Sequence, residues 1–197
     1  MRVQIKPIHQ IQRVNLLVNQ LEEMKQIDTQ LFMKRPKPEA WCGAEVLKHM
    51  IVGQQVYTDK IDRALKKAKP VQDEVESITP RSIPSFLIKR FPPIDGEIRH
   101  KMKTTKRFKP MLDPEKLTTD EVHQFLSEMK KMLEQLSVWV EETRKKDVLP
   151  IRFNSAIGPI VRFNASEACE FILCHNERHF QQLKNAIRSA KEKTVTA

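Results

Sequence analysis

Four long stretches of the chain carry apolar residues at every third or fourth position. In the first stretch, residues 8 to 33, these residues are Ile8, Ile11, Val14, Leu17, Val18, Leu21, Met24, Ile27 and Leu31. This spacing lays one apolar stripe along an α-helix of about 3.6 residues per turn. The other stretches run from about 43 to 68, from 118 to the charged run EETRKKD, and from 164 to about 189. With only four glycines and one tyrosine, the chain has little material for a β-rich fold, so we predict an all-α fold.

Proline-rich segments separate the expected helices. The run KRPKP (residues 34 to 38) follows the first stretch, and residues 70 to 117 contain prolines without sustained apolar periodicity. Each proline disfavours helical geometry in the residue before it. Residues 70 to 117 therefore form a long crossover, with one short helix near 85 to 88, between the second and third long helices. Four long helices with one long connection predict a four-helix bundle, in a single domain over residues 1 to 197.

Two capping signals mark the starts of the last two long helices. Thr118 and Glu121 have the spacing of a capping box, and so do Asn164 and Glu167. In each pair, the first side chain can accept a hydrogen bond from the backbone three residues on, and the carboxylate can accept one in return. We expect these helices to begin at residues 118 and 164.

The chain is basic, with a formal net charge of +10. Residues 81 to 110 hold nine Lys or Arg residues and two acidic residues, so much of the positive charge lies in the crossover. Basic segments can neutralise phosphates, but this one has only Phe86, Phe91 and Phe108 interleaved and no recognised nucleic-acid motif. We therefore interpret it as a solvated loop and do not expect nucleic acid as a partner. The alternative interpretation is that this basic segment lines a cleft and attracts an anionic ligand.

The cysteines and the apolar segments of the chain indicate the cellular compartment in which the protein resides. Cys42, Cys169 and Cys174 are odd in number and have no CxxC spacing, which argues against a secreted disulfide scaffold. The N-terminus has no apolar core of signal-peptide length, and no window approaches the roughly 18 apolar residues of a membrane span. These features predict a soluble, cytoplasmic protein with no membrane partner.

The stretch CHNERHFQQL, residues 174 to 183, places His175 and His179 four residues apart in the apolar stripe of the last helix. Leaving a buried imidazole nitrogen without a partner costs about 1 to 3 kcal/mol, so two buried histidines need an explanation. At this spacing both rings lie on one side of the helix and can bind one ion at about 2.0 to 2.1 Å. His49, on the apolar face of the second long helix, supplies a third imidazole. From the residues alone, two explanations remain open: the histidines are hydrogen-bonded within the core, or they form a metal site.

The zincin protease motif, H-E-x-x-H, is not present. Glu177 follows His175 by two residues and points about 200° away around the helix. We expect Glu177 to be a solvated surface carboxylate. His9, His100 and His123 are not expected to join the site.

Three segments resemble the DinB-like superfamily, also called YfiT-like metalloenzymes. They are AWCGAEVLKHMIVGQQ at 40 to 55, the IGP turn at 157 to 159 and FNASEACEFILCHNERHFQQLKNAIR at 163 to 188. Their order is similar to the family pattern of a tryptophan, a capped helix with one histidine, and a late helix with H-x-x-x-H followed by glutamine. The resemblance implies that His49, His175 and His179 are the metal ligands. Cys42 stands where the family more usually has serine, and a thiol is a poor helix cap.

This ligand set favours a divalent metal ion, Zn²⁺ or Ni²⁺, with an open position for water or substrate. Glu45, one turn before His49, and Gln182, three residues after His179, are candidates to orient the imidazoles or to act on a bound nucleophile. The resemblance implies a metal-dependent enzyme, either a hydrolase or a low-molecular-weight thiol S-transferase. Its partners would be a small-molecule substrate, anionic or used with a thiol cosubstrate, and the chain is compatible with a homodimer. The sequence leaves open a non-catalytic metal-binding or structural bundle and, as a reserve, a basic nucleic-acid-binding module.

Overall fold

The computed structural model describes residues 3–99, 104–158 and 160–195. Its body is made of four long helices, α1 (Pro7–Met24), α3 (Gly43–Lys67), α5 (Thr119–Lys145) and α6 (Ala165–Val195). The connections contain the short helices α2 (Gln30–Met33) and α4 (Ser82–Arg90) and the 3-10 turns η1 (Lys106–Phe108) and η2 (Pro114–Lys116). The predicted all-α bundle is confirmed.

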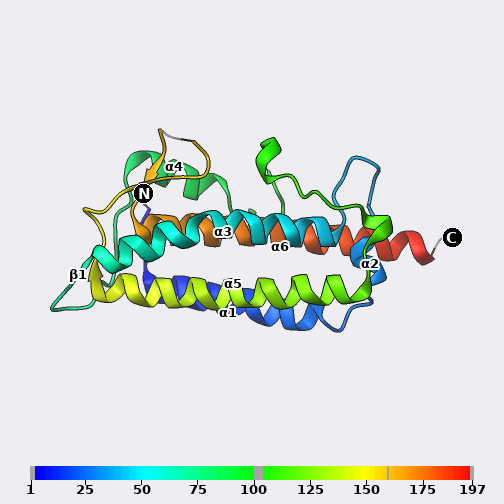
Figure 1. Cartoon of the computed structure of the whole chain (residues 1–197), viewed down its shortest axis with the longest axis horizontal. Coiled ribbons are helices and arrows are strands. Elements are labelled where there is room, and N and C mark those ends of the chain that lie inside the picture. Colours follow the sequence, from blue (N-terminus) through cyan, green and yellow to red (C-terminus); the bar gives the residue numbers. More distant parts are fainter. Residues whose placement is uncertain (1–2, 100–103, 159, 196–197) are drawn as a thin grey trace.

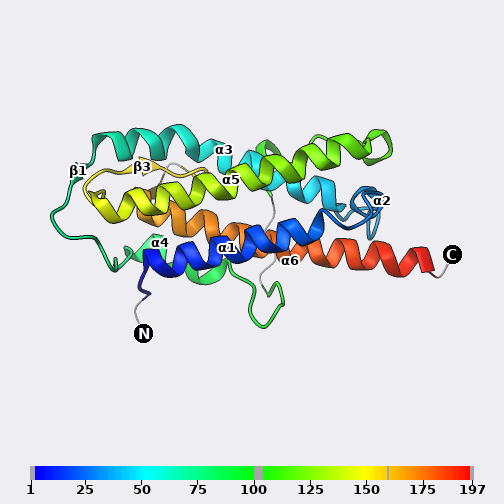
Figure 2. The same cartoon turned by 90° about the horizontal axis from the view of Figure 1, so that it is seen from below.

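The long helices lie in two layers, with α3 beside α6 in one layer and α1 beside α5 in the other (Figure 1). The bundle is closed by α3 packing on α5 and by α1 packing on α6, as the view from below shows (Figure 2). Because α3 and α5 run in the same direction, the crossover between them must return along the length of the bundle. It follows the outer side of the α3 and α6 layer, where α4 contacts α6 and η1 contacts α3. The crossover thus covers the two helices that carry the candidate histidines.

The core lies between the layers and contains residues from all four long helices. Leu21, Met50, Leu133 and Leu173 are among the side chains that are fully buried. Trp139 of α5 is also buried, and its indole N–H donates a hydrogen bond to Asp62 at 2.7 Å. Trp139 therefore has a packing role, because its ring fills the core and its indole N–H has a hydrogen-bond partner.

Two short antiparallel strand pairs join the ends of the helices. β1 (Lys69–Pro70) pairs with β2 (Lys146–Asp147), which ties the end of α3 to the end of α5. β3 (Phe153–Asn154) pairs with β4 (Arg162–Phe163), directly before α6. The loop between β3 and β4 is held against α3, because the Tyr57 hydroxyl accepts the Ala156 N–H at 3.0 Å.

Both predicted capping boxes are confirmed. The Glu121 N–H donates to Thr118 Oγ1 at 3.3 Å, and the Thr118 N–H donates to Glu121 Oε2 at 2.9 Å. The Asn164 and Glu167 pair has the same reciprocal bonds, at 2.9 and 3.0 Å. Glu167 also accepts the Arg81 backbone N–H at 2.9 Å and its guanidinium at 2.6 Å. This ion pair fastens the start of the crossover helix α4 to the start of α6.

The prediction of one helix over residues 8 to 33 is wrong. α1 ends at Met24, and α2 begins at Gln30 after a turn. The Asp28 carboxylate accepts the Gln30 N–H at 2.9 Å, and such a local side-chain bond offers the backbone an alternative to continued helix. The apolar stripe extends across the break because Met24 and Phe32 are both buried in the same core.

The last helix is longer than predicted, since α6 extends to Val195 rather than ending near Ser189. Its final turns stay attached to the body of the protein. Ala190 is buried, and Lys193 Nζ donates to the Pro36 carbonyl at 2.7 Å. Nowhere in the described part of the chain does a helix combine the length and apolar character needed to cross a bilayer.

Candidate metal centre

Three imidazoles from two helices meet on the side of the bundle that the crossover covers. His49 comes from α3, and His175 and His179 come from successive turns of α6. Their candidate ligand atoms all lie within 4.8 Å of one another, and the ring centroids are 4.4 to 5.3 Å apart. Nitrogens bound tetrahedrally to one Zn²⁺ ion lie about 3.4 Å apart, so modest ring rotations would close the set around an ion. The predicted convergence is confirmed.

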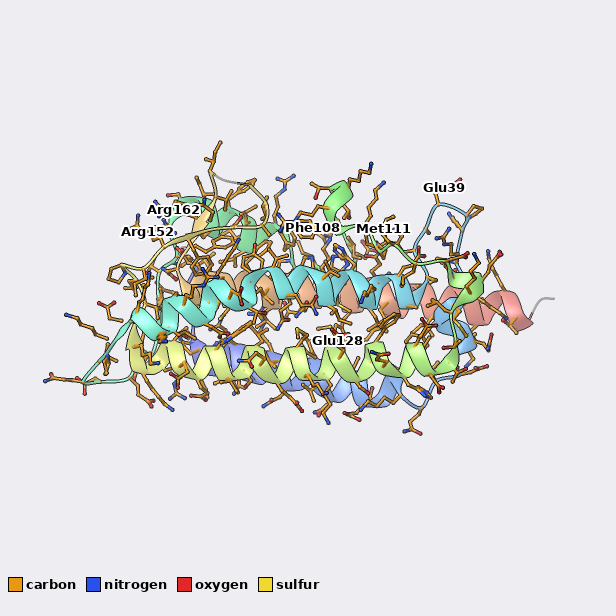
Figure 3. The ribbon with its side chains drawn as sticks, viewed as in Figure 1. Glu39, Phe108, Met111, Glu128, Arg152 and Arg162 are labelled. Atoms are coloured by element: carbon orange, nitrogen blue, oxygen red, sulfur yellow. The ribbon has the colours of Figure 1, made fainter. Side chains whose placement is uncertain are left out.

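Hydrogen bonds at Nδ1 orient two of these rings. His49 Nδ1 lies 2.7 Å from the carbonyl oxygen of Phe108. A carbonyl can only accept, so Nδ1 carries the proton and Nε2 keeps its lone pair. Phe108 belongs to η1, and Figure 3 shows it on the crossover, over the middle of the α3 and α6 layer. His179 Nδ1 lies 2.9 Å from Gln182 Oε1, which likewise leaves Nε2 with a lone pair. Such partners fix the tautomer and ring orientation of histidines that bind metals.

The contacts of Glu45 lie at the start of α3 and not at the imidazoles. Its Oε2 accepts the Cys42 N–H at 3.0 Å, which is the carboxylate half of a capping box at the start of α3. Arg35 donates its Nε to the same oxygen at 3.0 Å and its Nη2 to Oε1 at 2.6 Å. With both oxygens engaged at the helix start, Glu45 stabilises the helix that carries His49 and does not orient the imidazole by a direct hydrogen bond.

Burial lowers the pKa of each imidazole. For His175, burial and then the nearby His49 lower the pKa to about 3. Burial is also the largest cause of the lowered pKa of His49 and of His179. At neutral pH the three rings are therefore uncharged, which is the form that binds metal ions.

A cavity of about 160 Å³ opens beside the imidazoles. Its lining includes Tyr57, Phe91, Phe108, Phe171, Ile172 and Arg178. None of the lining residues in the described part of the chain is Asp or Glu. Gly53 of α3 faces His175, and a Cβ atom at this position would lie 3.4 Å from the His175 Cε1 atom. This distance is an ordinary van der Waals contact, so the Gly53 position lies directly against the His175 ring.

Sequence reasoning missed several residues around the histidines. Arg178 and Phe171 follow the periodicity that identified the site, since Arg178 comes three residues after His175 and Phe171 four residues before it. Phe91 and the Phe108 carbonyl come from the crossover, where no periodic pattern indicates which atoms face the bundle. The helical contributions were thus predictable, and those of the crossover were not.

Glu177 points away from the imidazoles as predicted, but it is not a solvated surface carboxylate. Arg13 of α1 donates two hydrogen bonds to it, both at 2.7 Å, and a third to Glu170 at 2.7 Å. The prediction failed because the side of α6 that carries Glu177 packs against α1 rather than facing water.

The other candidate ligands lie apart from this centre. Cys42, Cys169 and Cys174 are buried free thiols, and burial raises the pKa of each. A raised pKa disfavours the thiolate, which is the form that binds metal ions. His9 and His123 are exposed and outside the histidine cluster, whereas His100 lies outside the described residues.

Comparison with known proteins found no matching family model, curated protein or solved structure. The likeness to the DinB-like superfamily therefore rests on the residues of this chain and stays a prediction.

Proposed function

We propose that the chain is a metal-dependent enzyme that holds one Zn²⁺ or Ni²⁺ ion on His49, His175 and His179. The observation that carries this proposal is the convergence of three neutral imidazoles beside a cavity. A purely structural site is commonly closed by a fourth protein ligand, whereas three protein ligands leave a position for water or substrate. No further His, Cys, Asp or Glu joins the cluster among the described residues.

Each part of the site has a separate task in this proposal. The Phe108 carbonyl and Gln182 hold two rings with Nε2 available, and burial keeps all three rings neutral. The aromatic wall formed by Phe91 and Phe171, with ring centroids 4.8 Å apart, excludes water from one side of the cavity. When bound, the metal ion would lower the pKa of a coordinated water or thiol and so supply a nucleophile at neutral pH.

The lining favours thiol transfer over hydrolysis. Zincin hydrolases use a glutamate to take the proton from water, and no carboxylate lines this cavity among the described residues. The Tyr57 hydroxyl keeps its proton at neutral pH, because burial raises its pKa to about 12, so it cannot take a proton from water. A free thiol, with a pKa of about 8.5, needs far less assistance than water to lose its proton. In such a transfer the thiol loses its proton to solvent, its sulfur bonds to an electrophilic carbon, and the leaving group departs as an anion with the electrons of the broken bond.

The test is a rate measurement on protein loaded with one equivalent of Zn²⁺ or Ni²⁺. Glutathione, cysteine and coenzyme A are each offered with chlorodinitrobenzene, and nitrophenyl esters serve as hydrolysis substrates. We expect metal-dependent thiol conjugation that exceeds ester hydrolysis and falls to the background rate in His179→Ala. His123→Ala, which removes an exposed histidine of α5, should keep the full rate. If the loaded native protein and the His179→Ala variant react equally slowly with every pair, the histidines serve structure and the proposal fails.

A further inference from the structure

Arg178 is the charged residue that lines the histidine cavity in the described part of the chain. It lies on α6 between the two candidate ligands of that helix, directly before His179 and three residues after His175. It is largely buried, with a relative exposure of 7%. An arginine side chain stays charged in a protein, so it places a permanent positive charge at this wall of the cavity.

A bound divalent ion would make the cavity more positive. The ion would add two positive charges to that of Arg178, and the described lining contains no Asp or Glu. Charged groups in a poorly solvated site are stabilised by opposite charge. A ligand that brings negative charge into this space is therefore favoured over a neutral one of the same shape.

Two further cations lie close to the cavity. Lys60 of α3 lies beside Tyr57, with its Nζ 5.8 Å from the ring centroid, and donates to the Asn154 carbonyl at 2.9 Å. Burial, and then the positive charge of Arg107, lower the pKa of Lys60, so these two cations are near each other. Arg107 in turn lies over the ring of Phe108, 5.3 Å from its centroid. Tyr57 and Phe108 both line the cavity, so this pair of cations would draw anions toward it.

The remaining wall of the cavity suits an apolar group. The Phe91 and Phe171 rings meet edge to face, and their centroids lie 6.1 and 6.3 Å from that of His175. Ile172 and Ile157 add aliphatic surface. One planar guanidinium matches one carboxylate in charge and shape, because it can form two parallel hydrogen bonds with it.

We propose that Arg178 selects the substrate of this site, and that the substrate is a small organic carboxylate with an apolar body. This inference rests on the proposed function, because it assigns the substrate class of the same metal site. The carboxylate lies against Arg178, the apolar body lies against the phenylalanines, and the reacting atom is left facing the histidines. Arg178 is thus a specificity-determining residue that sequence reasoning did not identify.

The experiment measures binding by calorimetry, with benzoate and phenylacetate as probes and their neutral amides for comparison. Each probe is titrated into zinc-loaded and metal-free protein, and zinc content is measured on every sample. We expect both carboxylates to bind more tightly than their amides. Arg178→Gln should weaken carboxylate binding by about tenfold to a hundredfold, the usual range for a hydrogen bond to a charged group, and leave the amides unchanged. Lys184→Gln removes an exposed positive charge from the same helix and should change neither.

Further measurements keep each outcome decisive. Arg178→Lys retains the charge without the planar fork and should bind carboxylates with intermediate affinity, which covers the case in which Arg178→Gln folds poorly. Phenyl phosphate serves as the competing anion, and tighter Arg178-dependent binding of it than of both carboxylates would overturn the choice of carboxylate. Unchanged carboxylate affinity in a zinc-loaded Arg178→Gln protein would overturn the whole inference. Failure to take up zinc counts against the proposed function, whereas Arg178-dependent carboxylate binding should persist, though more weakly, in metal-free protein.

Discussion

A strong chelator is expected to lower the melting temperature of the metal-loaded protein by about 5 to 10 °C. An ion that binds only the folded state adds about 2.7 kcal/mol at a hundredfold excess over its dissociation constant. For a domain of this size, each kcal/mol shifts the melting temperature by about 2 to 4 °C. The effect should be this large because His49 and the two histidines of α6 come from different helices, so the ion would cross-link the layer that they form.

Two variants serve as the test and the control for this prediction. His179→Ala should melt at the same temperature with and without chelator, whatever its own stability, because it lacks one of the three ligands. His123→Ala should respond to chelation as the native protein does, since its side chain is exposed and outside the histidine cluster. An unchanged melt after exhaustive chelation of a protein shown to be loaded would contradict the account.

Gln182→Ala is expected to weaken metal affinity by about tenfold to a hundredfold, the usual effect of removing a partner that orients a metal ligand. In the structure Gln182 Oε1 lies 2.9 Å from His179 Nδ1. Without this acceptor the imidazole can rotate and can change tautomer, so fewer of its states present Nε2 to the ion. Competition with a chromogenic chelator measures the change.

The neighbouring glutamine is a matched control. Gln181 has the same side chain one position earlier, but its amide bonds Asn185 rather than an imidazole. Gln181→Ala should keep native metal affinity, and Gln182→Glu, which retains an acceptor, should restore it. Equal affinities in Gln181→Ala and Gln182→Ala would show that the hydrogen bond to His179 is not needed to hold the ring.

Helical periodicity predicted most of the fold and the three histidines. The stripe on α6 identified His175 and His179 as residues of a covered face, because the spacing of side chains along a helix fixes which of them share a face. It failed after Met24, where the chain turns before α2 begins, and in that turn the Asp28 carboxylate accepts the Gln30 N–H. The periodic spacing of apolar residues shows which side chains share a helix face, and it carries little information on such local polar contacts.

The contacts around the histidines were less predictable because they depend on atoms brought in by irregular chain. The Phe108 carbonyl reaches His49 from 59 residues away in the sequence, and backbone atoms leave no signal in residue type. Glu45 had the right spacing both to cap α3 and to face His49. Arg35, from the loop before that helix, holds the carboxylate at the cap, and this tertiary contact decides between the two roles.

The central claim is that one divalent ion is bound by three imidazoles and no thiolate. The most direct measurement is the zinc X-ray absorption fine structure of protein loaded with one equivalent of Zn²⁺. We predict three imidazole nitrogens at about 2.0 to 2.1 Å, with the remaining position filled by oxygen from water. A sulfur neighbour at about 2.3 Å, or fewer than three imidazoles, would contradict the assignment of His49, His175 and His179 as the ligands.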